Sequence, residues 1–181
     1  MRTLVTSLLL GAIGTLAHAQ DRGERQARYA LDLFKAACVS SFGIEKRVGA
    51  WAEANSVAEL APESARTYLR GKAGRIWMFV TDLGKFTLIS QEGGNCTVQA
   101  ERAKASSLKE FYTVFLSELP PDFKTTMVQE DNRATPMGVL YTIVQDSDSE
   151  RSGIVLRTLL STSESESAYV QGLLTHQARR R

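Results

Sequence analysis

Two stretches of similar sequence decide the fold: GRIWMFVTD at residues 74–82 and GVLYTIVQD at residues 138–146. Each runs from a glycine through apolar and β-branched residues to an aspartate, the composition of a buried strand that enters a turn. The two stretches match at Gly, Val and Asp, and they pair similar residues at the Ile/Leu, Trp/Tyr and Phe/Ile positions. Because strand-like segments follow at 86–90 and 154–161, we expect two β-hairpins.

The similarity continues beyond these stretches in the same order. Residues 87–90 resemble 158–161, and residues 98–100 resemble 170–172. An amphipathic helix pattern precedes each set, so the order predicts an internal duplication of a helix-plus-three-strand unit. The alternative is that strand-turn-strand segments look alike by composition alone. The halves would cover about 24–102 and 106–176 of one domain at 20–181.

Helical periodicity supplies the remaining elements. Apolar residues recur at helical spacing over 24–40 and 44–55, and Pro62 begins a helical turn that ends near Leu69. The clearest stripe lies at 108–119 and includes Phe115; Ser107 and Glu110 suggest a capping box at its start. Further strands are expected at 123–130 and 168–175. The predicted class is α+β: an antiparallel sheet, or two related sheets, with helices on one side.

The first nineteen residues are typical of a cleavable signal peptide. Arg2 precedes an uncharged apolar run at 4–16, and Ala17-His18-Ala19 places small residues where signal peptidase reads them, so cleavage should fall before Gln20. The run is short for a spanning helix, which needs about 20 apolar residues. We therefore expect a signal peptide at 1–19, a periplasmic or secreted product, and no integral membrane segment after cleavage.

Export determines how Cys38 and Cys96 are interpreted. An even cysteine count in an exported chain favours a disulfide. Two cysteines with no nearby histidine make a poor metal site, and a redox pair would normally be Cys-x-x-Cys. We expect a structural disulfide, no metal and no cofactor.

Composition and motifs point away from several functions. The chain is 43% hydrophobic and 23% charged, with a formal net charge of +2, too balanced to suggest a nucleic-acid partner. After cleavage the one histidine is His176, close to a terminus that we expect to be mobile, so it is a poor general base. No hydrolase or metalloprotease motif occurs, and the acids at 146–150 do not fit a calcium loop. We expect no catalytic residues.

The most concentrated basic stretch outside the tail consists of Arg66, Arg70, Lys72 and Arg75. It is a candidate anion- or partner-binding site, suited to a lipid headgroup, an acidic glycan or an acidic envelope protein. The alternative is a solvated face beside the first strand.

A wider pattern includes Phe34-x-x-x-Cys38, Trp51, Leu69-x-Gly71, Gly74-x-x-Trp77 and Cys96-x-Val98. With the signal peptide, this pattern resembles a family of small exported or lipid-anchored proteobacterial proteins with no assigned activity. The resemblance covers mainly residues 34–100, and the chain departs from the lipid-anchored members because no lipobox cysteine follows the apolar run. The resemblance implies a two-cysteine α+β domain in the bacterial envelope and carries over no catalytic residues.

Two function classes follow from these observations. The favoured one is a non-catalytic periplasmic or secreted binding or accessory protein, for instance an inhibitor or immunity-type protein acting on an envelope component. The alternative is an envelope hydrolase that uses converging carboxylates. A polar cleft with such carboxylates would favour the enzyme, whereas an exposed apolar or basic patch would favour binding.

Overall fold

The computed structural model describes residues 13–119, 141–144, 154–162 and 172–180, and the architecture below refers to those residues. They form four α-helices, a π-helical segment and six strands. In chain order the elements are α1 (Ile13–Leu33), η1 (Phe34–Val39), α2 (Glu45–Ala54), α3 (Pro62–Leu69), β1 (Gly74–Val80), β2 (Lys85–Gln91), β3 (Asn95–Ala100), α4 (Ala105–Ser117), β4 (Tyr141–Val144), β5 (Ile154–Thr162) and β6 (Gly172–Arg180). The predicted α+β class is confirmed, with one antiparallel sheet rather than two.

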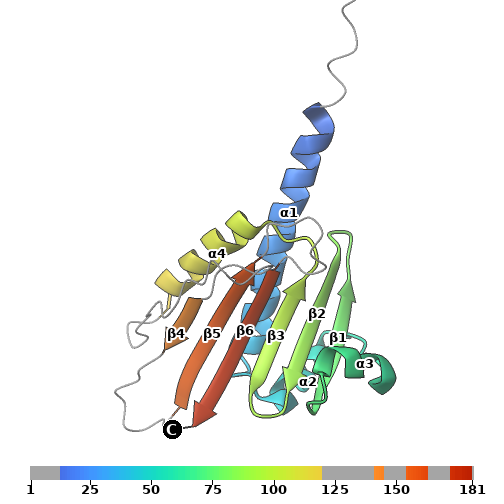
Figure 1. The fold of residues 1–181 in the computed structure, drawn as a ribbon, viewed down its shortest axis with the longest axis vertical. Coiled ribbons are helices and arrows are strands. Elements are labelled where there is room, and N and C mark those ends of the chain that lie inside the picture. The colour runs from blue at the N-terminus through green and yellow to red at the C-terminus, as the bar shows by residue number, and fades with distance from the viewer. Residues whose placement is uncertain (1–12, 120–140, 145–153, 163–171, 181) are drawn as a thin grey trace, which may run out of the picture.

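The first helix forms because its apolar residues lie on one stripe. Ala27, Ala30, Leu31 and Phe34 are buried along the face that α1 and η1 turn toward the sheet. Figure 1 shows α1 crossing behind the strands, with its N-terminal turns projecting beyond them. The helix thus spans the predicted cleavage position, and removal of residues 1–19 would leave α1 starting at Gln20.

The sheet is built from two three-stranded meanders. Its strand order is β1-β2-β3-β6-β5-β4, so consecutive strands are neighbours within each meander, and the meanders join where β3 pairs with β6. This is the order produced by two copies of one unit that are related by a two-fold axis perpendicular to the sheet. The helices agree with it: α1 and α4, one from each half, pack against each other on the same side (Figure 1).

The register locates the axis of this pseudo-symmetry. One cross-strand row runs through all six strands and consists of Trp77, Leu88, Val98, Leu174, Leu160 and Tyr141. The predicted match of Trp77 with Tyr141 makes Val98 and Leu174 the equivalent residues of the two halves, and because these two pair directly, the axis would pass between them.

The same row corrects the sequence alignment of the halves. Leu88 corresponds to Leu160 rather than Leu159, and Val98 corresponds to Leu174 rather than Val170. The later matches followed residue identity, whereas the hydrogen-bonded ladder decides register, and a slip of one residue would turn a strand's side chains to the opposite face.

The two faces of the sheet carry separate clusters of buried side chains. α1, α2 and α4 cover the face of Trp77, Leu88 and Val98, where the main core lies. α3 packs on the opposite face, where Ala65 and Leu69 contact a cluster that includes Ile76 and Ile89. Because adjacent strand residues point to opposite faces, the strands can bury side chains on both faces of the sheet. The helices that we expected on one side therefore lie on both sides.

Two local predictions were wrong, and others lie outside the described residues. α4 begins at Ala105 after Lys104, so Ser107 is a buried residue inside the helix and forms no capping box. The last strand, expected at 168–175, extends to Arg180 because β6 pairs with β5 over its whole length. The stripe on α4 is confirmed, with Phe115 buried. The strand at 123–130 and the turn at 146–153 lie outside the described residues.

Candidate functional site

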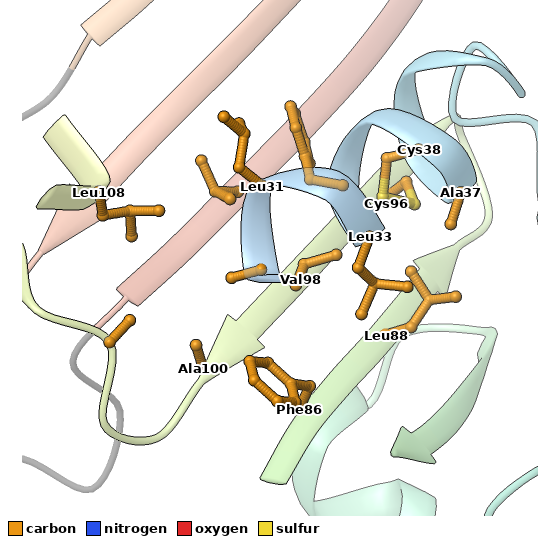
Figure 2. Close-up of a cluster of buried hydrophobic side chains, with 14 of the residues drawn as sticks. Leu31, Leu33, Ala37, Cys38, Phe86, Leu88, Cys96, Val98, Ala100 and Leu108 are labelled. Atoms are coloured by element: carbon orange, nitrogen blue, oxygen red, sulfur yellow. A yellow bond between two sulfur atoms is a disulfide. The ribbon is translucent and has the colours of Figure 1, made fainter. Parts of the chain in front are cut away.

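The predicted disulfide joins the first helical segment to the centre of the sheet. Cys38 in η1 and Cys96 on β3 are bonded, with an S–S distance of 2.01 Å and Cα atoms 5.3 Å apart. Both cysteines are fully buried among apolar side chains, as Figure 2 shows. A disulfide is typical of proteins in an oxidising compartment. Its position holds the end of η1, and therefore the loop that follows, against β3.

His176 lies beside this disulfide, in the core rather than at a mobile terminus. It is the cross-strand partner of Cys96, it is 1% exposed, and its ring meets that of Phe34 edge-on with centroids 6.3 Å apart. Among the described residues neither imidazole nitrogen has a hydrogen-bond partner. Burial lowers the pKa of His176 from 6.5 to about 4, because the charged form is poorly solvated there.

The sequence-based view of His176 was therefore wrong about position. Proximity to the end of the chain suggested mobility, but antiparallel pairing of β6 with both β3 and β5 holds the residue in place. The ring is buried in the core and, with its lowered pKa, is neutral at pH 7. Ser90, on the other side of Cys96 in the same row, also has a buried hydroxyl without a described partner.

The loop at 40–44, which we call the Phe42 loop, presents two apolar side chains at one end of the molecule. Phe42 is 42% exposed and Ile44 is 43% exposed. Phe42 has φ of +55°, a left-handed conformation that a bulky side chain rarely adopts, and Gly43 follows with φ of +64°. Helices commonly end in such a residue, but glycine or asparagine usually occupies the position.

Backbone hydrogen bonds and close packing hold this loop. The amides of Phe42 and Gly43 donate to the carbonyl oxygens of Val39 and Cys38, each at 3.0 Å. Gly43 lies directly on the β2–β3 turn, where a side chain would collide with the carbonyl oxygen of Gly94 and approach the His176 ring at 3.6 Å. The loop is therefore packed against the turn and the histidine, close to the disulfide. Sequence reasoning missed it, although Phe-Gly directly after a helix is a signal for a helix end.

The candidate basic stretch is split between different environments. Arg66, Arg70 and Lys72 are exposed on and just after α3. Arg75 lies on β1 and pairs with Glu59 at 2.6 Å and Glu53 at 3.4 Å.

Several contacts fix Arg75 in this position. Its guanidinium carbon lies 5.0 Å from the ring centroid of Trp77, and a side chain at Gly49 on α2 would collide with the guanidinium. The Glu59 hydrogen bond is the main reason that the pKa of Arg75 is raised. Arg75 is therefore engaged in a structural cluster, and only the other three members of the stretch are exposed.

A shallow depression lies where α1 leaves the sheet. Its lining includes Arg22, Gln26, Lys85 and Arg102. Buried Gln26 donates to the carbonyl oxygen of Leu83 and accepts from the Arg102 amide at 3.0 Å. Arg22 donates through Nε to the same Leu83 oxygen at 3.1 Å. These bonds tie α1 to the β1–β2 turn and to the segment before α4, so the depression is a structural junction.

Within the described ranges, no cluster of three or more His, Cys, Asp and Glu side chains could hold a metal ion. In the same part of the chain, no helix combines the length and apolar character needed to cross a bilayer. Comparison with known proteins yields no matching family model, no matching curated protein and no matching solved structure. The fold and the geometry described above therefore carry the functional argument.

Proposed function

We propose that this protein is a non-catalytic binding or accessory protein of the bacterial envelope, exported to the periplasm or secreted. The observation that carries the proposal is the Phe42 loop. Phe42 combines an unfavourable backbone conformation with an exposed aromatic ring, and such strain persists only where the surrounding structure imposes it. Strained, well-supported residues often mark sites of function, and an exposed aromatic ring suits contact with a partner.

Several features of the core support this loop. A disulfide, a glycine packed against a turn and a buried histidine all lie beneath it. Such preorganisation reduces the ordering cost of binding. An inhibitor or immunity-type protein is one version of the proposal, in which the partner would be an envelope hydrolase.

The carboxylate hydrolase has less support. In the described part of the chain, Glu53 and Glu59 converge on Arg75, whose positive charge balances them. A general acid or nucleophile must instead face a substrate.

Site-specific photo-crosslinking tests the binding proposal. A benzophenone amino acid at position 42 should give a defined adduct in intact cells, and the matched control is position 114 on α4, where Val114 is 47% exposed. Equal labelling at the two positions, or none at position 42, would count against the Phe42 loop as a contact site.

Export is tested separately by sequencing the N-terminus of protein recovered from the periplasmic fraction. The proposal expects the chain to start at Gln20. Protein found only in the cytoplasm with residues 1–19 intact would contradict it.

A further inference from the structure

Strand β1 lies at one edge of the sheet, and its sequence is apolar and uncharged from Ile76 to Val80 (Figure 1). The stretch Ile-Trp-Met-Phe-Val contains no glycine or proline, and its residues favour extended backbone. Segments of this kind pair readily with other strands, and an uncovered edge strand offers its unpaired backbone groups as a template. An uncovered β1 edge would therefore favour pairing with another chain.

Hydrogen bonds show which backbone groups of β1 point away from β2. At the β1–β2 turn, the amides of Thr81 and Gly84 donate to each other's carbonyl oxygens at 2.9 and 3.2 Å. The N–H and C=O of one residue in an antiparallel strand point to the same side, and the side alternates along the strand. The backbone groups of Val80 and Ile76 therefore point outward. The Leu60 amide agrees with this assignment, because it donates to the Ile76 carbonyl oxygen at 2.7 Å.

Residues 57–60, which we call the strap, cover part of this edge. The strap joins α2 to α3, and Glu59 forms an isolated antiparallel bridge with Trp77. The Leu60 side chain packs against the buried cluster that contains Ile76 on the face covered by α3. In the described part of the chain, the strap thus occupies the place where a next strand would pair with β1. Val80 lies past the strap and is 73% exposed.

An accessible ion pair fastens the strap to β1. The Glu59 carboxylate accepts hydrogen bonds from Arg75 at 2.6 Å from Nη2 and at 3.0 Å from Nε. The side chains of Arg75 and Glu59 are 32% and 42% exposed, and ion pairs this accessible to water contribute little to stability. By contrast, β1 pairs with β2 over its whole length. The strap is therefore held more weakly than the strand that it covers.

These contacts describe a cover that can be displaced. We propose that the Arg75–Glu59 pair latches the strap over the edge of β1, and that the open strap lets β1 pair with β1 of a second copy of this chain. The closed strap would keep the protein monomeric. The inference goes beyond the binding function proposed for the Phe42 loop and does not depend on it.

The sequence of β1 argues for a second copy as the occupant. A two-fold axis through Met78 would place Ile76 of one copy opposite Val80 of the other, and Trp77 opposite Phe79. Each apolar residue would then meet an apolar residue, and aromatic rings would lie next to each other, which are favourable cross-strand pairs. The same edge on both subunits would make the contact, as in other two-fold dimers.

Sedimentation velocity and amide hydrogen exchange test the proposal with the full protein as recovered from cells. The parent protein should be monomeric. Glu59→Lys places a second cation beside Arg75, so the Leu60 amide should exchange about tenfold faster and a dimer should form as concentration rises. Glu63→Lys is the matched control, because Glu63 is exposed at the start of α3 and undergoes the same change of charge. This control should behave as the parent protein does.

Val80→Pro distinguishes pairing through β1 from other association. The Val80 amide points away from β2, so proline leaves the β1–β2 ladder intact and removes a donor from the free edge. Combined with Glu59→Lys, this change should return the protein to a monomer while the Leu60 amide still exchanges fast.

Each step of the proposal has an outcome that overturns it. If the Leu60 amide of Glu59→Lys exchanges at the parent rate, the ion pair does not hold the strap. Faster exchange without dimer formation overturns self-pairing, and so does a dimer that persists with Val80→Pro or forms equally in Glu63→Lys. Glu59→Gln removes the charge alone and must change exchange and association in the same direction, which keeps the proposal testable if Glu59→Lys does not fold.

Discussion

Lowering the pH from 7 to 4.5 should protonate His176 in the unfolded chain well before it does so in the folded protein. Burial lowers the pKa of His176 in the folded state to about 4, whereas 6.5 applies to an exposed histidine. Between these values the unfolded state binds more protons, so stability increases with pH. The part of the unfolding free energy that depends on a neutral His176 is fully present above pH 6.5 and is lost as the pH falls toward 4.

The magnitude follows from the two pKa values. Each pKa unit corresponds to 1.36 kcal/mol, so the full difference is about 3 kcal/mol, of which about 1 kcal/mol is lost by pH 5.5. This is a large share of the stability of an ordinary domain, about 5–15 kcal/mol. The described neighbours of the ring do not offset the charge: Phe34 is apolar, Cys96 is in a disulfide, and Gly43 has no side chain.

Urea unfolding of the parent protein and His176→Leu at several pH values measures this effect. Leucine removes the two nitrogens that lack partners, so the variant should be more stable at pH 7 by about 1–3 kcal/mol. The advantage should then grow by a further 2–3 kcal/mol at pH 4.5. Taking the difference between the two proteins cancels the titration of the carboxylates they share. A difference that stays constant from pH 7 to 4.5 would refute a buried neutral imidazole.

Three further predictions concern the disulfide, the α4 core and the ion-paired Arg75. Mass mapping without reduction should find Cys38 linked to Cys96, and replacing both with alanine should lower the free energy of unfolding by about 4 kcal/mol, since the bridge spans 58 residues; free thiols in protein from the periplasm would contradict the bond. Phe115→Ala should cost about 3–5 kcal/mol in urea unfolding because the ring is buried in the core, and a neutral result would mean that α4 packs differently. Gly49→Ala should be less favourable for the stability of the parent protein than for that of Arg75→Ala, because the new methyl group collides with the guanidinium; a double-mutant cycle without coupling would count against this packing.

Local patterns predicted most of the individual elements. The helix over 24–40, the hairpin around residue 83 and the stripe containing Phe115 were all visible, because burial of one face imposes a period on the sequence. The capping box predicted at Ser107 is absent, because a Ser-x-x-Glu spacing also occurs inside helices. Here the helix already begins at Ala105, and Leu108 and Phe111 pack into the core.

The candidate site was less predictable, because its parts come from separate segments. The loop after η1, the turn at Gly94 and the end of β6 meet only when β3 pairs with β6. His176 appeared mobile because position in the chain was the available guide, and sequence offered no sign that β6 would lie between two other strands. Arg75 appeared to be free of ion-pair partners because its partners are distant in the sequence: Glu53 lies on α2 and Glu59 in the segment before α3.

The sequence by itself determined the α+β class, the repeated helix-and-strand order and the pairing of the two cysteines, since each depends on local periodicity or on a small number of reactive side chains. Only the tertiary structure decided the single sheet, the register that places Val98 opposite Leu174, and the strained loop that exposes Phe42. These depend on hydrogen bonds and packing between segments far apart in the chain. The free energy of these interactions depends on the whole ladder of paired strands, so no single stretch of residues predicts them.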